Sequence, residues 1–443
     1  MFAVFLFPNN SIAGIFWAAV LSFILPFLLN ENRRLLFISL GVIAFAIVAL
    51  LISSNSRSGW LGCTVASFYI FYRRKTKRNK KIAAIGAIFF LFLFFIALVL
   101  YKGDSSSGRK HIYEISATIW KDNWVKGIGL GKFKTQFNEY QADYFSTNDI
   151  DSKKALLADN TFYAFNDYLQ WGIEMGLAGV LSFVVLLCLT IYRIRYIQNT
   201  IGNKSIFISA TAALMCIAIA ALFSYPLQII SIQTIVLPCL MIVAFYPAKD
   251  HVPSLAINFI TIAYKGIALV LIFAFITNTG KAIDAKRVGK EATELESAGY
   301  KTEAINMYKM LTVKYPDVGY NWFYCAQQLF YSNRLGEAIE CLNNCTKYYS
   351  DSRVYKLKAD IEWELKNYNA AELNYLRTIY MVPNRMSSRL DVLNFYLETK
   401  NNDRATYWAK SILSMPIKVP SDRVNEMLQQ TKLILLKLEN ASY

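Results

Sequence analysis

One arginine stands out among the side chains that could do chemistry, because of where it lies. Arg57 belongs to the sequence SRSGW at 56–60, at the edge of an apolar stretch. An arginine at such an edge is costly unless its side chain reaches the interface or meets a partner. Its guanidinium is a planar fork that matches phosphate oxygens. Arg57 is therefore either an anion ligand or an interfacial side chain that reaches out to water.

Two further polar motifs indicate chemistry less specifically. The run GIGLGKF at 127–133 suggests a phosphate loop, but it departs from GxxxxGK[ST], which disfavours nucleotide binding. Asp149-Ile150-Asp151 has the DxD form of metal-dependent sugar transferases, although so short a pattern is common by chance in polar loops. The chain has two histidines, which excludes a histidine-rich metal site. These short motifs therefore give weak support for a nucleotide or metal site.

The composition excludes a single soluble domain. Hydrophobic residues make up 55% of the chain, and they are concentrated before about residue 280. The formal net charge is +16, but much of the excess lies in short loops between apolar runs. Lysine and arginine in such loops are kept on the cytoplasmic side of a membrane. Membrane topology therefore accounts for the positive charge, and we expect no nucleic-acid partner. The seven cysteines form no CxxC motif, which disfavours a zinc or thioredoxin-type site.

Apolar runs before residue 280 predict a polytopic membrane domain, since most approach the roughly 20 residues that a spanning helix needs. The runs are 11–29, 35–52, 60–72, 82–101, 173–192, 205–224, 229–246 and 256–278. If each run crosses once, the basic loops at 30–34, 73–81 and 193–204 fall on one side, which is then cytoplasmic. The loop 102–172 and the chain after about residue 279 then lie outside.

The tail after Thr279 is charged and amphipathic, with a weak repeat of about 34 residues. Small residues recur at equivalent positions: Ala304, Ala326, Ala338, Ala359, Ala371 and Ala405. They allow two helices of a hairpin to approach closely, and Pro316 and Pro383 are placed to end a second helix. This pattern resembles the tetratricopeptide repeat, with about four units over 285–419 but no WxxLG signature. Such a solenoid presents a concave surface to a peptide or partner protein, or it serves as a spacer.

The motifs before the tail occur in an order that is typical of a known family. SRSGW opens a helix, a basic cytoplasmic loop follows, and SSGR, GIGLGKF and FNDYLQWGIEMGLAG come after it. From its start to about residue 280, the chain resembles the O-antigen ligase and polymerase superfamily, which includes bacterial protein O-oligosaccharyltransferases. A tetratricopeptide-like tail also occurs in that family.

The resemblance implies a glycosyl transfer at the outer face of the cytoplasmic membrane. No metal, no nucleotide sugar and no other cofactor are then expected. The donor would be a glycan on a polyprenyl pyrophosphate, and the acceptor a lipid, a glycan or a protein hydroxyl. Arg57 and Arg109 match arginines of the family. Both would neutralise the pyrophosphate as it leaves.

The chain departs from the family in the segment that carries its proposed base. The family usually reads HNxYL, and here Phe165 replaces the histidine, while Asn166 and Tyr168 are retained and Glu174 follows. Phenylalanine cannot take a proton, so the base must be another outward group. The candidates are His111, Asp159 and Asp167. The family also has further helices before FPNNSIAG, so we expect this chain to lack an N-terminal portion.

We therefore predict an all-α chain in two parts. A polytopic α-helical membrane domain of about eight helices occupies 1–280, with the outer loop at 102–172. An α-solenoid of helical hairpins occupies 281–443. We favour a glycosyltransferase of the bacterial inner membrane, with a periplasmic tail. The alternatives are a non-catalytic, membrane-anchored repeat scaffold in envelope glycan assembly, and a transporter of lipid-linked sugars, for which we find no repeated halves.

Overall fold

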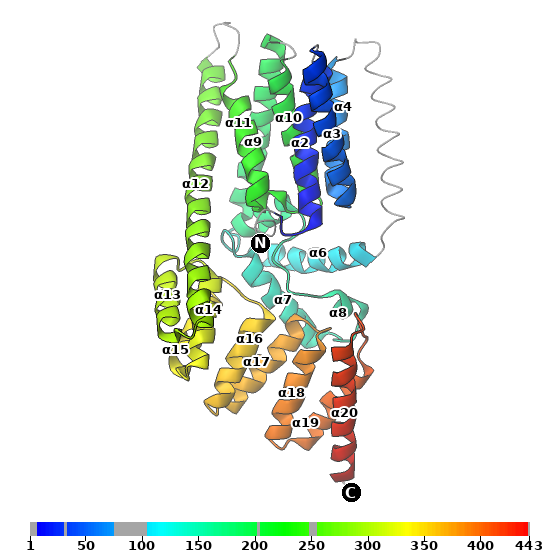
Figure 1. Ribbon diagram of the computed structural model, residues 1–443, viewed down its shortest axis with the longest axis vertical. Helices are drawn as coiled ribbons and strands as arrows, with labels where there is room; N and C mark the ends of the chain where they lie inside the picture. Colours follow the sequence, from blue (N-terminus) through cyan, green and yellow to red (C-terminus); the bar gives the residue numbers. More distant parts are fainter. Residues whose placement is uncertain (1–6, 31–32, 75–103, 202–203, 248–254, 442–443) are drawn as a thin grey trace. The chain divides into compact units, whose positions relative to one another are not determined.

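The computed structural model describes residues 7–30, 33–74, 104–201, 204–247 and 255–441, and every regular element within these ranges is a helix (Figure 1). The prediction of an all-α chain is therefore confirmed. The chain divides into two units. The first comprises Met1–Gly103, Trp124–Gly127 and Tyr163–Gly280. The second comprises Asp104–Asn123, Ile128–Phe162 and Lys281–Tyr443.

The first unit is a bundle of apolar helices. Its elements are α2 (Asn10–Asn30), α3 (Arg34–Ser53), α4 (Arg57–Arg74), α9 (Asp167–Ile201), α10 (Ser205–Ala221), η1 (Pro226–Gln228), α11 (Ile230–Phe245) and the first part of α12 (Leu255–Ser297). α2, α3, α9 and α12 are long and apolar enough to cross a membrane, and α10 and α11 are shorter apolar helices. The predicted run 82–101 lies outside the described residues.

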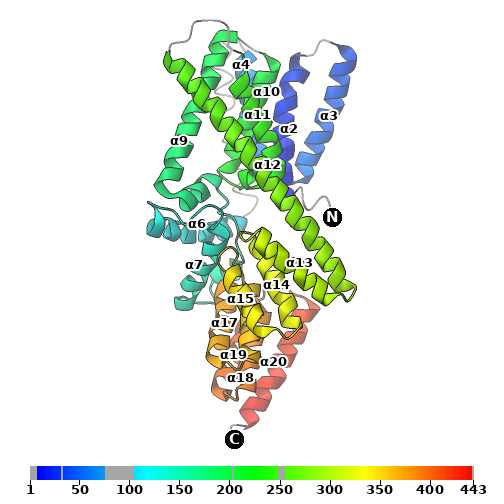
Figure 2. The ribbon, with the colours of Figure 1, turned by 90° about the vertical axis from the view of Figure 1, so that its left-hand side faces the viewer.

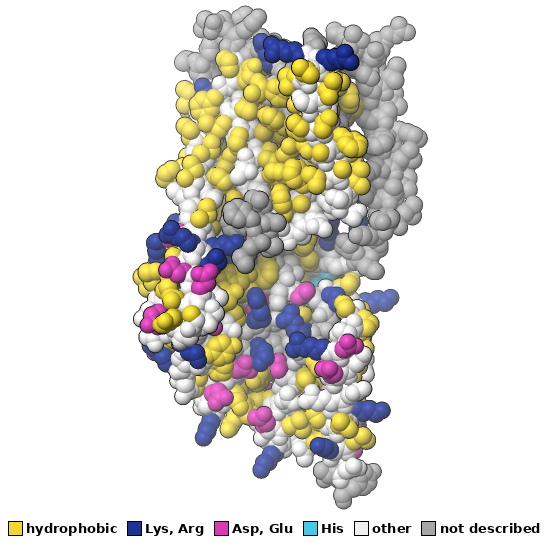
Figure 3. Space-filling view, viewed as in Figure 1, with side chains coloured by type: hydrophobic (Ala, Val, Ile, Leu, Met, Phe, Trp, Pro, Cys, Tyr) yellow, Lys and Arg dark blue, Asp and Glu magenta, His cyan; other side chains and the backbone are white. Residues whose placement is uncertain are grey.

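Large apolar side chains stay exposed on the outside of this bundle. Leu35 and Phe45 on α3, and Phe259 and Phe273 on α12, are each more than two-thirds exposed. Figure 3 shows hydrophobic side chains over much of this unit, with lysine and arginine at one end. Soluble monomers rarely expose so continuous an apolar surface, so this one fits lipid.

Small residues allow three helices of the bundle to pack closely. A Cβ on Gly59 of α4 would lie 2.8 Å from the carbonyl oxygen of Gly14 on α2. A Cβ on Gly62 would overlap the carbonyl of Cys216 on α10. Close approach through small residues is how membrane helices gain packing energy in lipid. The glycine of the SRSGW motif therefore has a packing role.

Helix α9 extends further than hydropathy predicted. The residues from Arg193 to Ile201, expected in a loop, continue the helix. Arg193 is buried, and its Nη2 donates to the carbonyl oxygens of Ala244 (3.2 Å) and Tyr246 (2.9 Å) at the end of α11. Carbonyls at a helix C-terminus lack intrahelical partners, and a cation satisfies them. Arg193 therefore caps the end of α11.

The second unit joins most of the predicted outer loop to the tail. The loop contributes α6 (Asp104–Asn123), α7 (Phe133–Thr147) and α8 (Lys153–Leu157). The tail contributes the end of α12 and then α13 (Lys301–Lys314), α14 (Gly319–Tyr331), α15 (Leu335–Cys345), α16 (Ser352–Glu364), α17 (Tyr368–Met381), α18 (Met386–Glu398), α19 (Asn402–Ser414) and α20 (Asp422–Ala441). Figure 2 shows the tail helices following one another as hairpins.

Four equivalent turns define the hairpins of the described tail. Gly299, Asn333, Lys366 and Lys400 recur every 33–34 residues, and all have positive φ. The residue after each donates its N–H to the carbonyl five positions earlier, at 2.8–2.9 Å. This is the Schellman geometry that ends a helix and reverses the chain. The backbone turns therefore recur with the period that the alanine and proline spacing predicted.

The small residues of the repeat lie where the helices of this tail meet. The six alanines that defined the repeat are all 0% exposed: Ala304, Ala326, Ala338, Ala359, Ala371 and Ala405. Ala292, one period before Ala326, is also 0% exposed. A larger side chain at these points would force the helices apart. A helical repeat region thus follows the membrane helices.

The outer loop and the tail lie on the same side of the membrane, because they contact each other within one unit. The whole of 102–172 was expected in the membrane domain, whereas Asp104–Asn123 and Ile128–Phe162 group with the tail. The boundary along the chain falls between Gly280 and Lys281. Any topology must therefore place an even number of crossings between 162 and 281.

Candidate functional site

The SRSGW motif forms the start of α4. Ser56 is fully buried, and its Oγ accepts from the N–H of Gly59 (3.2 Å) while donating to the carbonyl of Ser11 (2.7 Å). Ser56 therefore caps α4 and ties it to α2. Arg57, the first residue of α4, is half-buried and makes no hydrogen bond or ion pair within the described ranges. The positive end of a helix dipole and a guanidinium both favour negative charge.

The segment that replaces the family's HNxYL forms the start of α9. Asn166 caps the helix, because its Oδ1 accepts from the N–H groups of Tyr168 and Leu169, both at 3.0 Å. Phe165 has φ +53°, a left-handed conformation that is rare for a bulky residue. Such strain concentrates at functional sites. The missing histidine thus coincides with an unusual backbone position.

Tyr225 organises the surroundings of Phe165, and sequence reasoning did not identify it. Its ring stacks on Tyr163 with centroids 4.0 Å apart and meets Phe165 edge-on at 5.2 Å. Its hydroxyl accepts a 2.6 Å hydrogen bond from the amide of Asn9. Asn9 also caps α2, through the N–H of Ile12. The Asn-rich FPNN segment therefore contacts the residues around Phe165, and no short pattern in the sequence indicates this.

Two glycines bring the entry of the outer loop against the kink in α9. A Cβ on Gly127 would overlap the carbonyl of Glu174 and the amide of Gly176. Gly176 has φ +63° and ψ −149°, which only glycine adopts readily, and a Cβ there would overlap the carbonyl of Val125. The first glycine of GIGLGKF is thus a packing residue. Glu174 is buried, and its Oε1 accepts from the amide of Gln170 at 3.1 Å.

The three base candidates differ in access. Asp167 is 3% exposed, and its Oδ2 accepts from the N–H of Leu227 (2.8 Å) in η1. His111 is also 3% exposed, between the rings of Tyr144 and Phe145, and its burial lowers the pKa of the imidazole. Asp159 is the exposed one, with 62% of its side chain accessible and Arg385 at 3.6 Å.

The predicted site residues are divided between the two units. Arg57, Phe165, Asn166, Asp167, Tyr168 and Glu174 belong to the first unit. Arg109, His111 and Asp159 belong to the second, where Arg109 is half-buried on α6. The first unit brings the motif at 163–174 together with the FPNN segment and the loop entry.

The outer loop is bound along the repeats by buried polar contacts. Asn138 Nδ2 donates to the carbonyl of Ser350 at 2.7 Å, and Gln141 Nε2 donates to that of Met381 at 2.6 Å. Both side chains are buried. Glu139 forms an ion pair with Arg377 at 2.6 Å. Buried amides of this kind specify one docking register, because a shift would leave them unsatisfied.

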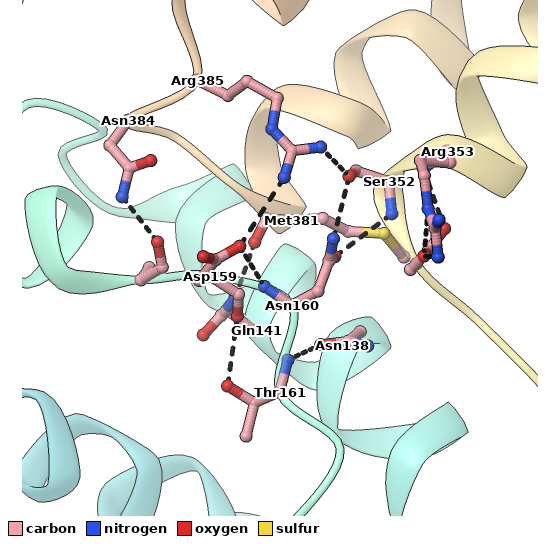
Figure 4. Close-up of polar contacts among 12 residues, drawn as sticks. Asn138, Gln141, Asp159, Asn160, Thr161, Ser352, Arg353, Met381, Asn384 and Arg385 are labelled. Carbon is pink, nitrogen blue, oxygen red and sulfur yellow. Dashed lines mark hydrogen bonds and ion pairs between the residues drawn. The ribbon is translucent and has the colours of Figure 1, made fainter. Parts of the chain in front are cut away.

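The same contact continues through the segment that leads to the motif at 163–174. Asn160 exchanges two 3.2 Å hydrogen bonds with Ser352, one from its amide to Oγ and one from the N–H of Ser352 to its Oδ1 (Figure 4). Asn384 Nδ2 lies within reach of three loop carbonyls and is nearest to that of Ala158, at 2.6 Å. Arg385 donates to Ser352 Oγ at 2.6 Å. The turns between hairpins thus hold the loop.

The DxD motif also belongs to this contact. Asp149 Oδ1 accepts from the N–H of Asp151 at 2.9 Å, a local turn. Asp151 Oδ1 pairs at 2.7 Å with Arg389, whose side chain is 1% exposed. Within the described residues, no group of three or more His, Cys, Asp and Glu side chains is arranged to hold a metal ion. The two aspartates therefore have structural partners.

The fold and these contacts define a class: a multi-spanning helical membrane protein whose outer loop docks on a helical repeat tail. Residues 42–184 match the family model described as O-Antigen ligase. The match confirms the predicted resemblance, and it includes Arg57, Arg109 and the motif at 163–174. It supports a ligase-like, glycan-transferring role at the membrane.

The other comparisons add no functional evidence. No curated protein matches the chain. The solved structure titled "Crystal structure of MamA protein" is 14% identical, with a TM-score of 0.30, covering 35% of this chain and 86% of that one. A likeness this low carries no argument about fold or function.

Proposed function

We propose that the chain transfers a glycan from a polyprenyl pyrophosphate to a lipid, glycan or protein acceptor at the outer face of the bacterial inner membrane. The observation that carries the proposal is Arg57, half-buried at the N-terminus of α4 without a partner in the described ranges. It lies within the O-antigen ligase match. An unpaired cation is suited to a ligand that brings its own negative charge.

The reaction needs one bond exchange and one proton transfer. An acceptor hydroxyl attacks the anomeric carbon of the donor, the bond from that carbon to the pyrophosphate oxygen breaks, and the pyrophosphate leaves with the electron pair. Arg57 and Arg109 would neutralise the charge that develops on it. Asp159 would take the hydroxyl proton, since its carboxylate is the accessible one of the three candidates.

The tail serves, in this proposal, to position the outer loop. Asn138, Gln141 and Asn160 are bound by the repeats, and Asp159 lies beside Asn160. A free scaffold needs no such contact between its repeats and this loop. The contact supports the enzyme over the non-catalytic alternative, because a site that includes Arg109 and Asp159 depends on a fixed loop.

The arginine assignment is tested in membranes with lipid-linked glycan as donor. Arg57→Ala should reduce transfer about a hundredfold, as expected for removing one charge contact worth roughly 3 kcal/mol. Arg57→Lys should rescue partly, because an ammonium lacks the fork. Arg34→Ala, an exposed arginine at the start of α3, is the matched control. Full activity of Arg57→Ala would reject the assignment.

The outward placement of the tail is tested by a fusion at Tyr443. A reporter active only in the cytoplasm should stay silent there, because the basic loops at 30–34 and 73–81 are predicted on the opposite side. The same reporter in the loop 73–81 should be active. A signal from the fusion at Tyr443 would reverse the orientation of both the loop and the tail.

A further inference from the structure

Two adjoining hollows open beside the last hairpins, and neither is lined by a residue assigned to the transfer reaction. One has a volume of about 660 Å³ and the other about 540 Å³, within the size range of small-ligand sites. They share Glu372 and Tyr396 as a common wall. The second hollow is completed by the loop residues 145–151. The hollows therefore form one groove where α17, α18 and α19 meet the outer loop.

Each hollow has an exposed tyrosine that is supported by a tryptophan. Tyr368 is 46% exposed, and its ring meets Trp363 with centroids 5.3 Å apart. Tyr407 is 61% exposed and meets Trp408 edge-on, also at 5.3 Å. Such packing fixes the orientation of the exposed rings. A flat, fixed ring with a free face suits the C–H face of a sugar ring, which is apolar although its edges carry hydroxyls.

The polar groups between the rings form a fixed network. Tyr396 donates to Glu372 at 2.7 Å and accepts from Arg404 at 3.0 Å, and Arg404 forms an ion pair with Glu372. Arg404 remains more than half exposed. The network offers carboxylate acceptors and guanidinium donors at fixed positions, which is what pairs of sugar hydroxyls require.

The charge of the groove narrows the class of sugar. Its lining contains four carboxylates, Asp149, Asp151, Glu372 and Glu398, and one cation, Arg404. Like charges disfavour a uronic-acid chain, whose carboxylates would have to enter an acidic groove. The groove thus favours a neutral or amine-bearing glycan.

We propose that this groove binds several sugar units of the transferred glycan, with Tyr368 and Tyr407 as stacking platforms. The proposal rests on the proposed function for the identity of the ligand. The groove would bind the sugar units, whereas Arg57 would bind the pyrophosphate. The repeat tail would then recognise the sugar as well as position the loop.

The test uses the full chain in lipid nanodiscs and the glycan released by mild acid from the lipid-linked pool of the producing cell. The glycan is labelled at its reducing end, and binding is measured by fluorescence anisotropy. Tyr407→Ala and Tyr368→Ala should each weaken binding about tenfold. Tyr331→Ala, an equally exposed tyrosine on α14, should leave binding unchanged. Because these side chains are exposed, the variants should keep the melting temperature of the wild type.

The outcomes separate the groove from the transfer reaction. Arg57→Ala should bind the released glycan like the wild type, because this ligand carries no pyrophosphate. The proposal that the groove binds the glycan is overturned if the wild type does not bind it, or if both tyrosine variants bind it as tightly as the wild type. Either result counts even if the transfer activity is intact. If the wild type binds the glycan but has no transfer activity, the glycan-binding role of the groove is retained and the proposed function is rejected. The proposal is also overturned if hexagalacturonate binds more tightly than the released glycan, or if a basic peptide binds and no sugar does.

Discussion

Replacement of Arg389 by methionine tests whether the outer loop depends on the repeats. Arg389 is an almost fully buried arginine that links two tail helices to the loop. Its guanidinium donates to Asp151 (2.7 Å), to the carbonyl of Ile150 (3.1 Å), to that of Pro383 (3.1 Å) and to Ser411 Oγ (2.7 Å). Methionine retains most of the length of the side chain and removes every donor.

The expected loss of stability follows from the groups left without partners. A buried acceptor without its donor costs about 1–3 kcal/mol. Breaking a fully buried ion pair costs roughly 3–5 kcal/mol, but Asp151 keeps 38% of its side chain exposed and is partly rehydrated. We therefore expect a loss of about 3 kcal/mol. For a unit of this size, that lowers the melting temperature by about 6–12 °C.

The assay is thermal unfolding of the purified full chain, followed by limited proteolysis of the loop 128–162. Arg389→Met should melt earlier, and the loop should be cleaved faster. Asp151→Asn keeps an acceptor and should lose only about 1 kcal/mol. Arg334→Ala is the control, since Arg334 pairs with Glu337 on α15 and not with the loop. A melting temperature of Arg389→Met within 2 °C of wild type would show that the docking contributes little.

Three further predictions concern packing, strain and pH. Gly127→Ala and Gly176→Ala should each prevent accumulation in membranes by immunoblot, because a Cβ overlaps backbone at both; Gly41→Ala, with open space around it, should accumulate normally. Phe165→His should keep or raise transfer and make its rate depend on pH near 6–7, because histidine tolerates positive φ better and can take a proton. Burial raises the pKa of Asp391 to about 6, so the folded chain holds a proton that the unfolded chain releases. Stability should therefore fall as pH rises from about 4 to 6, and Asp391→Asn should raise the melting temperature at pH 8 but not at pH 4.

Local patterns in the sequence predicted the apolar helices and the tail hairpins, but not α6, α7 and α8 in the outer loop. Hydropathy predicted the apolar helices, and the short run 60–72 needed the extension to Arg57 that α4 has. Alanine spacing predicted the hairpins, because a helix–helix contact requires a small residue at a fixed period. The turns were not predicted, since Asn333, Lys366 and Lys400 adopt positive φ without being glycine. Because these three residues are not glycine, the composition gives no sign that the chain turns there.

Contacts between distant parts of the chain could not be predicted. Asn138 and Gln141 are ordinary polar loop residues in the sequence, and only the fold supplies their partners. Asp149-Ile150-Asp151 matched a metal motif, whereas the partner of Asp151 is Arg389, 238 residues away. The site was predicted from the order of motifs, which identifies residue types. It does not indicate that Phe165 is strained or that Tyr225 lies against it.

The docking of the loop on the tail also sets an order of events during synthesis. The hydrogen-bond partner of Asn138 lies 212 residues later in the chain, and that of Gln141 lies 240 residues later. At a synthesis rate of roughly 5–20 residues per second, the loop is made about 10–50 s before its partners in the repeats exist. During that interval, four apolar helices must insert between the two halves of one unit. The second unit therefore cannot complete its fold until these helices have been made, and a chain that stalls before α17 leaves the Gln141 amide without the carbonyl of Met381.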